Sequence, residues 1–260
     1  MNILFTICGR AGSKGLKNKN LKMFLGAPLV YYTIASAQLY IDRFNAENMI
    51  HVCLSSDSDE LIALVLKKAP KTLIIQRSAT LSGDIVSKTA VIKDCLHKAE
   101  SHYKTVFDTV VDLDITSPLR RIRDIKNATD KKLKRKDVDV VFSVTSARRN
   151  PYFNMVKKNL DDTVSLALES NYTARQQAPI MFDMNASIYA FEADFLRTNK
   201  TDRLFDGICE SIEMPDTAVL DIDSEEDLLL MEVMGDHFFK TDGEYGEIAQ
   251  HARSEGMNCE

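Results

Sequence analysis

The chain has 260 residues, of which 45% are hydrophobic and 27% charged, a balance typical of a globular protein with one substantial core. Its 38 acidic and 33 basic residues give a net charge of −5, which excludes the broad positive field expected of a nucleic-acid-binding protein. No apolar run could span a bilayer, and the five cysteines form no CxxC pair. We therefore expect a cytoplasmic protein that binds neither nucleic acid nor membranes.

The first feature along the chain is an apolar segment, Ile3–Cys8, followed by a loop rich in glycine and basic residues. The segment is too short for a signal peptide and predicts a buried strand. In the loop, residues 9–20, three glycines let backbone N–H groups approach an anion, while Arg10, Lys14 and Lys19 supply positive charge. The glycine spacing matches neither a Walker loop nor a dinucleotide fingerprint. The loop predicts a phosphate-binding site, with a lysine-rich surface turn as the alternative.

Strand and helix patterns alternate over the next hundred residues. Apolar runs predict strands at 49–57, 73–76 and 107–113, and amphipathic patterns predict helices at 29–38, 60–68 and 86–103. This alternation predicts an α/β fold with a mostly parallel central sheet covered by helices on both faces. Ligands of such sheets bind at the carboxyl ends of the strands, where the loops at 9–20, 55–59 and 114–120 would converge.

The pattern changes after a strand predicted at 138–144. Residues from about 147 to 184 are polar and aromatic, with hairpin-like fragments, and they predict an excursion from the sheet. Apolar runs at 186–191 and 212–214 then predict the return of the chain to the sheet.

The last predicted element is a helix over residues 224–234. Ser224 is the expected N-cap, and the acidic residues that follow it suit the positive end of the helix dipole. We expect a single domain over residues 1–236 and a polar, loosely ordered tail over residues 237–260.

Asp221 and Asp223 precede this helix. If the segment is extended, both carboxylates point to the same side, which suits a hard divalent cation. Acidic residues before a helix also commonly serve as caps. The basic loop near the N-terminus favours the first interpretation, because a nucleoside triphosphate needs both cationic side chains and Mg²⁺.

Six segments in a specific order resemble the CMP-sialic acid synthetase family, the cytidylyltransferases of nine-carbon acidic sugars. They are the loop 10–20, Arg77 with 81–84, 116–120, Arg175-Gln176, 185–189 and 221–223. The similarity covers residues 3 to about 234. Segments 147–154 and 183–189 are most similar to the CMP-N,N'-diacetyllegionaminic acid synthase branch of the family.

The resemblance implies a Rossmann-like nucleotidyltransferase fold and transfer of CMP from CTP to the anomeric hydroxyl of an α-keto acid sugar. N,N'-diacetyllegionaminic acid is the first choice of acceptor, and pyrophosphate is the second product. The resemblance also implies Mg²⁺ as cofactor and a homodimer formed by the excursion, so that the partner subunit contributes to the sugar site. Two alternatives remain: a nucleotidyltransferase for another keto-sugar or a sugar phosphate, and a nucleotide-binding module without turnover.

The resemblance assigns roles by position. The residues matched to CTP binding are Arg10, Ser13, Lys14, Lys19, Asn20, Arg77 and Ser87. Those matched to the acceptor are Asp114, Thr116, Ser117, Arg175, Gln176, Asn185 and Tyr189, with Arg175 on the sugar carboxylate. The catalytic set is Arg10, Lys19, Asp221 and Asp223, and the two aspartates are the metal ligands. Asp114 occupies a position that is generally glutamine in sialic acid synthetases, so it is open to a second interpretation as an additional metal ligand.

Overall fold

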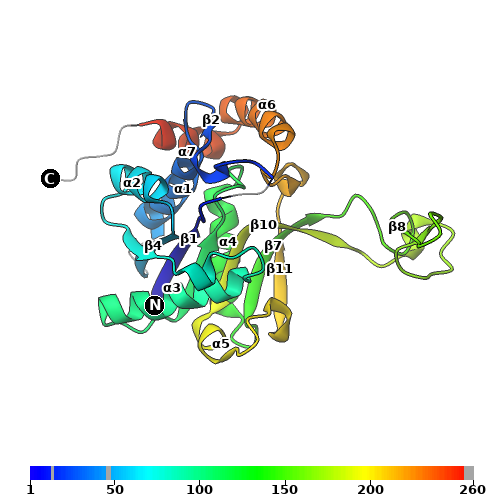
Figure 1. The fold of residues 1–260 in the computed structure, drawn as a ribbon, viewed down its shortest axis with the longest axis horizontal. Coiled ribbons are helices and arrows are strands. Elements are labelled where there is room, and N and C mark those ends of the chain that lie inside the picture. The colour runs from blue at the N-terminus through cyan, green and yellow to red at the C-terminus, as the bar shows by residue number, and fades with distance from the viewer. Residues whose placement is uncertain (13–14, 45–47, 255–260) are drawn as a thin grey trace.

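A seven-stranded sheet forms the centre of the molecule, as a computed structural model shows for residues 1–12, 15–44 and 48–254 (Figure 1). The strand order is β11-β7-β10-β6-β1-β4-β5. The strands are β1 (Asn2–Cys8), β4 (Met49–Ser56), β5 (Leu73–Gln76), β6 (Thr109–Leu113), β7 (Val140–Ser146), β10 (Phe182–Glu192) and β11 (Cys209–Glu213). β10 runs antiparallel to both neighbours, and the remaining pairs are parallel. The predicted mostly parallel sheet is confirmed.

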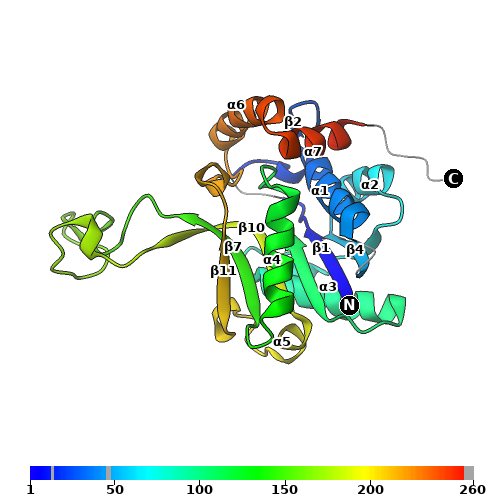
Figure 2. The same cartoon turned by 180° about the vertical axis from the view of Figure 1, so that it is seen from behind.

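Helices cover both faces of the sheet, as predicted (Figures 1 and 2). One apolar core joins the sheet to α1 (Leu29–Phe44), α2 (Asp59–Lys68), α4 (Ile122–Lys134), α6 (Glu225–Thr241) and α7 (Gly243–Arg253). A second core joins the opposite face to α3 (Lys88–Tyr103) and α5 (Ala193–Thr198). Within the described residues, no helix is both long and apolar enough to cross a membrane.

In the described part of the chain, two hairpins lie outside the main sheet. A short one, β2 (Met23–Phe24) with β3 (Ala27–Pro28), leads into α1. The other is β8 (Val156–Lys158) with β9 (Val164–Leu166), which lies between β7 and β10 in the chain. Figures 1 and 2 show that this excursion projects far from the sheet, with β8 at its outer end.

The prediction of a polar, loosely ordered tail over residues 237–260 is wrong for most of that segment, because two helices extend through it. α6 continues to Thr241, and Asp242 caps α7 by accepting hydrogen bonds from the backbone of the next turn. On α7, Tyr245, Ile248 and Ala249 are buried in the same core as α1. The buried residues of α7 recur at helical spacing, but they are few beside its polar residues, so average composition conceals the packing face.

Because Ile248 is fully buried, we expect Ile248→Ala to lower the free energy of unfolding by about 2–5 kcal/mol. Denaturant titration would measure the change. Gln250→Ala on the exposed side of the same helix is the matched control, with no measurable change expected. Equal stability of both variants would restore the interpretation of this segment as a tail.

Candidate active site

A polar cavity of about 430 Å³ opens at the carboxyl ends of the parallel strands β1, β5 and β6. Its lining includes eight residues that the sequence predicts for the site: Arg10, Lys19, Asn20, Arg77, Asp114, Thr116, Asp221 and Asp223. The loop at 55–59 supports this cavity from behind, since Asp57 Oδ1 accepts a hydrogen bond from the Ala11 amide at 2.7 Å. The fold thus brings together segments from both ends of the chain.

The glycine-rich loop packs directly against the acidic segment. Gly15 is required there, because a Cβ at this position would lie 2.3 Å from the carbonyl oxygen of Asp223. Lys19 Nζ lies 2.7 Å from Asp223 Oδ1 and joins the two segments by an ion pair. The Ile222 amide donates to the Thr116 carbonyl at 3.1 Å, which fixes the acidic segment beside the loop that follows β6.

Two arginines form the basic wall of the cavity. Arg77 is buried, and its Nε and Nη2 donate to the Oγ and carbonyl oxygen of Ser55 at 3.2 and 2.9 Å. Arg10 is partly exposed, and its Nη1 lies 2.6 Å from Asp84 Oδ1. Asn20 Nδ2 donates to the Arg10 carbonyl at 3.2 Å, so Asn20 holds the loop backbone. These contacts fix positive charge at the place where a phosphate chain would lie.

The residues present fit a magnesium ion. Asp221 Oδ1 is buried and has no hydrogen-bond partner among the described residues. Burial raises the pKa of Asp221, and the carboxylates of Asp114 and Asp223 raise it further, so a cation beside this group would relieve unfavourable charge. The described residues contain no cluster of three or more side chains that could hold a metal by itself. Asp221 and Asp223 would therefore share the ion with phosphate oxygens, as Mg²⁺ sites commonly do.

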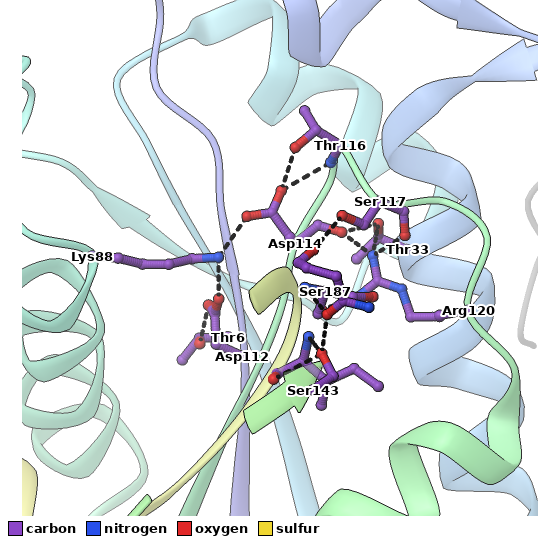
Figure 3. Close-up of polar contacts among 12 residues, drawn as sticks. Thr6, Thr33, Lys88, Asp112, Asp114, Thr116, Ser117, Arg120, Ser143 and Ser187 are labelled. Carbon is purple, nitrogen blue, oxygen red and sulfur yellow. Dashed lines mark hydrogen bonds and ion pairs between the residues drawn. The ribbon is translucent and has the colours of Figure 1, made fainter. Parts of the chain in front are cut away.

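Lys88 joins the site although sequence analysis did not select it. Its Nζ lies 2.9 Å from Asp112 Oδ2 and 2.5 Å from Asp114 Oδ2 (Figure 3). The other carboxylate oxygen of each aspartate is also occupied, by Thr6 Oγ1 at 2.7 Å in Asp112 and by Thr116 N and Oγ1 at 2.9 and 2.7 Å in Asp114. Burial raises the pKa of Asp114, but Lys88 and Thr116 hold it well below its ordinary value. Asp114 thus has a partner for each oxygen without a metal.

Arg120 is a second residue that sequence analysis left without a role. Its side chain is fully buried, and burial lowers its pKa to about 10, which leaves it charged at neutral pH. Nη1 donates to the Ser187 carbonyl and Nη2 to the Ser117 carbonyl, both at 2.9 Å, and Nη2 also contacts the Asp114 carbonyl (Figure 3). Arg120 therefore holds the loop after β6 against β10.

A second cavity, also of about 430 Å³, lies beside the first. It is lined by Ser87, Lys88, Thr89, Ile92, Met184, Tyr189, Phe191, Asp202, Arg203, Leu204 and Phe205. Ser87 caps α3 by accepting a hydrogen bond from the Ala90 amide at 3.1 Å, so the structure gives its hydroxyl a helix-capping contact. The Tyr189 ring lies 5.0 Å from Lys88 Nζ. Tyr189 and Lys88 thus mark the border between a polar cavity and a largely apolar one.

Four of the predicted residues lie elsewhere, and two more, Ser13 and Lys14, are outside the described residues. Ser117 and Asn185 are buried, and Asn185 Oδ1 accepts a hydrogen bond from Ser143 Oγ at 2.6 Å, so in this arrangement both side chains serve internal packing. Arg175 and Gln176 are exposed on the excursion, where Arg175 Nη2 donates to the Ala147 carbonyl at 3.1 Å. Neither residue lines either cavity.

Comparison with known proteins decides the family. Residues 4–234 match the cytidylyltransferase family. The chain belongs to this family. It is 40% identical over 232 residues to CMP-N,N'-diacetyllegionaminic acid synthase of Campylobacter jejuni, covering 89% of this chain and 94% of that protein. Over the same coverage it is 36% identical to post-translational flagellin modification protein B of Campylobacter coli.

A solved structure supports the cytidylyltransferase fold. CMP:2-keto-3-deoxy-manno-octonic acid synthetase, complexed with CTP, superposes with a TM-score of 0.64 and 16% sequence identity, over 91% of this chain and 99% of that one. At this identity the likeness concerns the fold alone. The predicted Rossmann-like nucleotidyltransferase architecture is confirmed, as is the resemblance to the cytidylyltransferases of acidic sugars.

Proposed function

We propose that this cytidylyltransferase transfers CMP from CTP to the anomeric hydroxyl of a nine-carbon α-keto acid sugar, with N,N'-diacetyllegionaminic acid as the first candidate. The observation that carries the proposal is the first cavity, in which the basic loop meets Asp221 and Asp223 at the carboxyl edge of the sheet. The 40% identity to a CMP-N,N'-diacetyllegionaminic acid synthase supports the choice of acceptor.

The chemistry follows from the charges in the cavity. The acceptor hydroxyl oxygen bonds to the α-phosphorus, the bond to the β-phosphate oxygen breaks, pyrophosphate leaves, and the hydroxyl proton is lost to solvent. Arg10 and Lys19 stabilise the negative charge that grows on the phosphates during this displacement. Asp221 and Asp223 would hold Mg²⁺, which supplies further neutralisation of the phosphate charge when bound.

The direct test is pyrophosphate release from CTP with Mg²⁺ and a panel of acceptors. The panel contains several nine-carbon keto acid sugars, an eight-carbon keto acid sugar and a sugar 1-phosphate. We expect release with at least one nine-carbon acid and the most efficient turnover with N,N'-diacetyllegionaminic acid. Release with the sugar phosphate alone would favour the first alternative, and CTP binding without release would favour a non-catalytic module.

We also propose that the excursion forms a homodimer. Large apolar side chains are exposed along it in this chain: Met155, Val156, Leu160, Val164, Leu168, Tyr172, Ile180, Phe182 and Met184. A patch of this kind marks a protein interaction surface. A second copy of the chain is the partner we favour, because an isologous contact between two projecting hairpins closes with two-fold symmetry. Such a dimer would bring exposed Arg175 close to a neighbouring subunit.

Val156→Asp combined with Val164→Asp is expected to convert the dimer to a monomer. The two valines lie on one face of the β8–β9 hairpin and are 58% and 64% exposed. Light scattering should show a fall from twice to once the 29.3 kDa chain mass. Ser165→Asp adds a single negative charge on the opposite face and should leave the mass unchanged. A monomeric unmutated protein would refute the dimer.

A further inference from the structure

Lys88 occupies a singular place in the site. Among the residues that line the two adjacent cavities described above, it is the one that faces both. Arg10, Lys19 and Arg77 line the first cavity alone, and Arg203 lines the second alone. A ligand that occupies both cavities would therefore lie against Lys88.

The position of Lys88 in its helix is unfavourable on local grounds. It is the first residue of α3, where the helix dipole favours negative charge, and the first turn of α3 contains no acidic residue. The compensating charges come from β6 and the loop after it, through Asp112 and Asp114. A local electrostatic cost that distant residues offset is typical of a functional position.

The ammonium group is held rigidly. Asp112 is fully buried and accepts a hydrogen bond from Thr6, while Asp114 accepts two from Thr116. Burial alone lowers the pKa of Lys88, but the two carboxylates raise it well above its ordinary value. At neutral pH the group is therefore a fixed cation and cannot act as a general base.

One donor of this cation remains for a ligand. An ammonium group has three N–H donors: one donates to Asp114 Oδ2, and Asp112 Oδ2 lies 2.9 Å from Nζ in an ion pair, so the two carboxylates engage at most two donors and leave a third. The third has no hydrogen-bond partner among the described residues, and the side chain is 30% exposed. The Tyr189 ring, 5.0 Å from Nζ, forms the wall on the side of the second cavity.

We propose that Lys88 binds the carboxylate of the acceptor sugar at the border of the two cavities. This inference rests on the proposed function. In an α-keto acid sugar, the anomeric carbon carries both the carboxylate and the attacking hydroxyl, so a cation that holds the carboxylate also positions the hydroxyl beside the α-phosphate. The nucleotide has its own cations in Arg10, Lys19 and Arg77. Arg175, which the family resemblance assigns to the sugar carboxylate, lines neither cavity, so Lys88 is the cation available to that carboxylate at the border.

Steady-state kinetics of Lys88→Met test the proposal. Loss of one charge-assisted hydrogen bond should raise the KM for the acceptor by about 10- to 100-fold, with the KM for CTP within about twofold of the unmutated value. Lys88→Arg keeps the charge and should recover part of the loss. Lys98→Ala is the control from the same helix, since Lys98 is exposed, pairs with Asp94 and lines neither cavity.

A chemical cycle separates recognition from folding. Calorimetry measures the affinities of the acceptor and of its uncharged carboxamide for the unmutated protein and for Lys88→Met. All four measurements are made in the presence of a non-hydrolysable CTP analogue. The amide should bind at least about tenfold more weakly than the acid to the unmutated protein, and equally weakly to the variant. If Lys88→Met alone is unstable, Lys88→Met with Asp112→Asn removes the more deeply buried of the two carboxylates that lose their cation and serves in its place.

Different results would contradict the role of Lys88 and the proposed function. An undiminished preference for the acid in Lys88→Met overturns the inference, as does a raised KM for CTP with an unchanged KM for the acceptor, which would assign Lys88 to the α-phosphate. Failure of the unmutated protein to use any acid sugar overturns the proposed function instead.

Discussion

Asp221→Asn, alone or combined with Asp223→Asn, is expected to abolish magnesium-stimulated pyrophosphate release. The two carboxylates line the cavity beside the basic loop, and the buried Oδ1 of Asp221 has no protein partner among the described residues. A bound divalent cation contributes several kcal/mol to charge stabilisation, so turnover should fall by about a thousandfold or more. The measurement is the rate of pyrophosphate release as a function of Mg²⁺ concentration.

Thermal stability without metal provides the second measurement for this variant. A carboxyl group whose pKa is raised in the folded state is less favourable there as an anion than in the unfolded chain, so at neutral pH the ionised Asp221 lowers stability. Asp221→Asn should therefore keep or raise the Tm of the metal-free protein. It should also remove the rise in Tm that Mg²⁺ with CTP gives the unmutated protein.

Asp216→Asn is the control for the acidic pair, because Asp216 is exposed on the same segment and does not line the cavity. It should keep both activity and the response to Mg²⁺. Retained magnesium-stimulated turnover in Asp221→Asn, or a clear fall in its metal-free Tm, would contradict the assignment of Asp221 as a ligand.

The parts of the site that could be predicted from the sequence are those that local rules describe. Alternating strand and helix patterns fix the edge of the sheet at which the loops meet, and Gly15, Lys19 and the acidic pair are recognisable from residue type and spacing. The glycine-rich loop and the acidic pair are about two hundred residues apart in the sequence, and they come into contact because both segments lie at that edge of the sheet. The Cβ clearance at Gly15 and the Lys19–Asp223 ion pair give this contact its physical reason.

The residues that sequence analysis missed depend on contacts between distant segments. The place of Lys88 in the site becomes visible only in the structure, where β6 and the loop after it bring Asp112 and Asp114 to its ammonium group. The role of Arg120 likewise depends on β10, which pairs antiparallel with β6 and places the Ser187 carbonyl within hydrogen-bond distance of the Arg120 guanidinium. A lysine in the first turn of the helix predicted at 86–103 is the one local signal for Lys88, since that turn favours acidic residues. Arg120 offers no comparable signal.

Asn185 and Ser117 are residues that the sequence assigns to the acceptor site but that contact other parts of the protein in the structure. Both lie in segments that resemble the family's acceptor-binding motifs, yet their side chains are buried and bonded within the protein. A motif can be preserved because its residues shape the backbone around a site, and residue type alone does not separate that role from direct contact with a ligand.

Arg10→Ala is expected to reduce turnover by at least about a hundredfold while leaving the fold intact. The guanidinium projects into the cavity from the glycine-rich loop and pairs with Asp84 at 2.6 Å. A partly exposed ion pair of this kind contributes at most about 1 kcal/mol to stability, so the Tm should change little. The loss should appear mainly in kcat, because charge on the α-phosphate and pyrophosphate is largest in the transition state. Steady-state kinetics with saturating CTP would measure it.

Two further variants make the Arg10 result interpretable. Arg10→Lys keeps the charge but lacks the fork that engages two phosphate oxygens, so it should retain part of the activity. Lys22→Ala is the control, because Lys22 matches Arg10 in side-chain exposure, 30%, and forms an ion pair of similar length with Glu225. Lys22 does not line the cavity, so its loss should leave kcat unchanged. If Lys22→Ala and Arg10→Ala lost activity equally, the general field of the basic loop would account for the effect, and the specific role of Arg10 on the phosphates would be wrong.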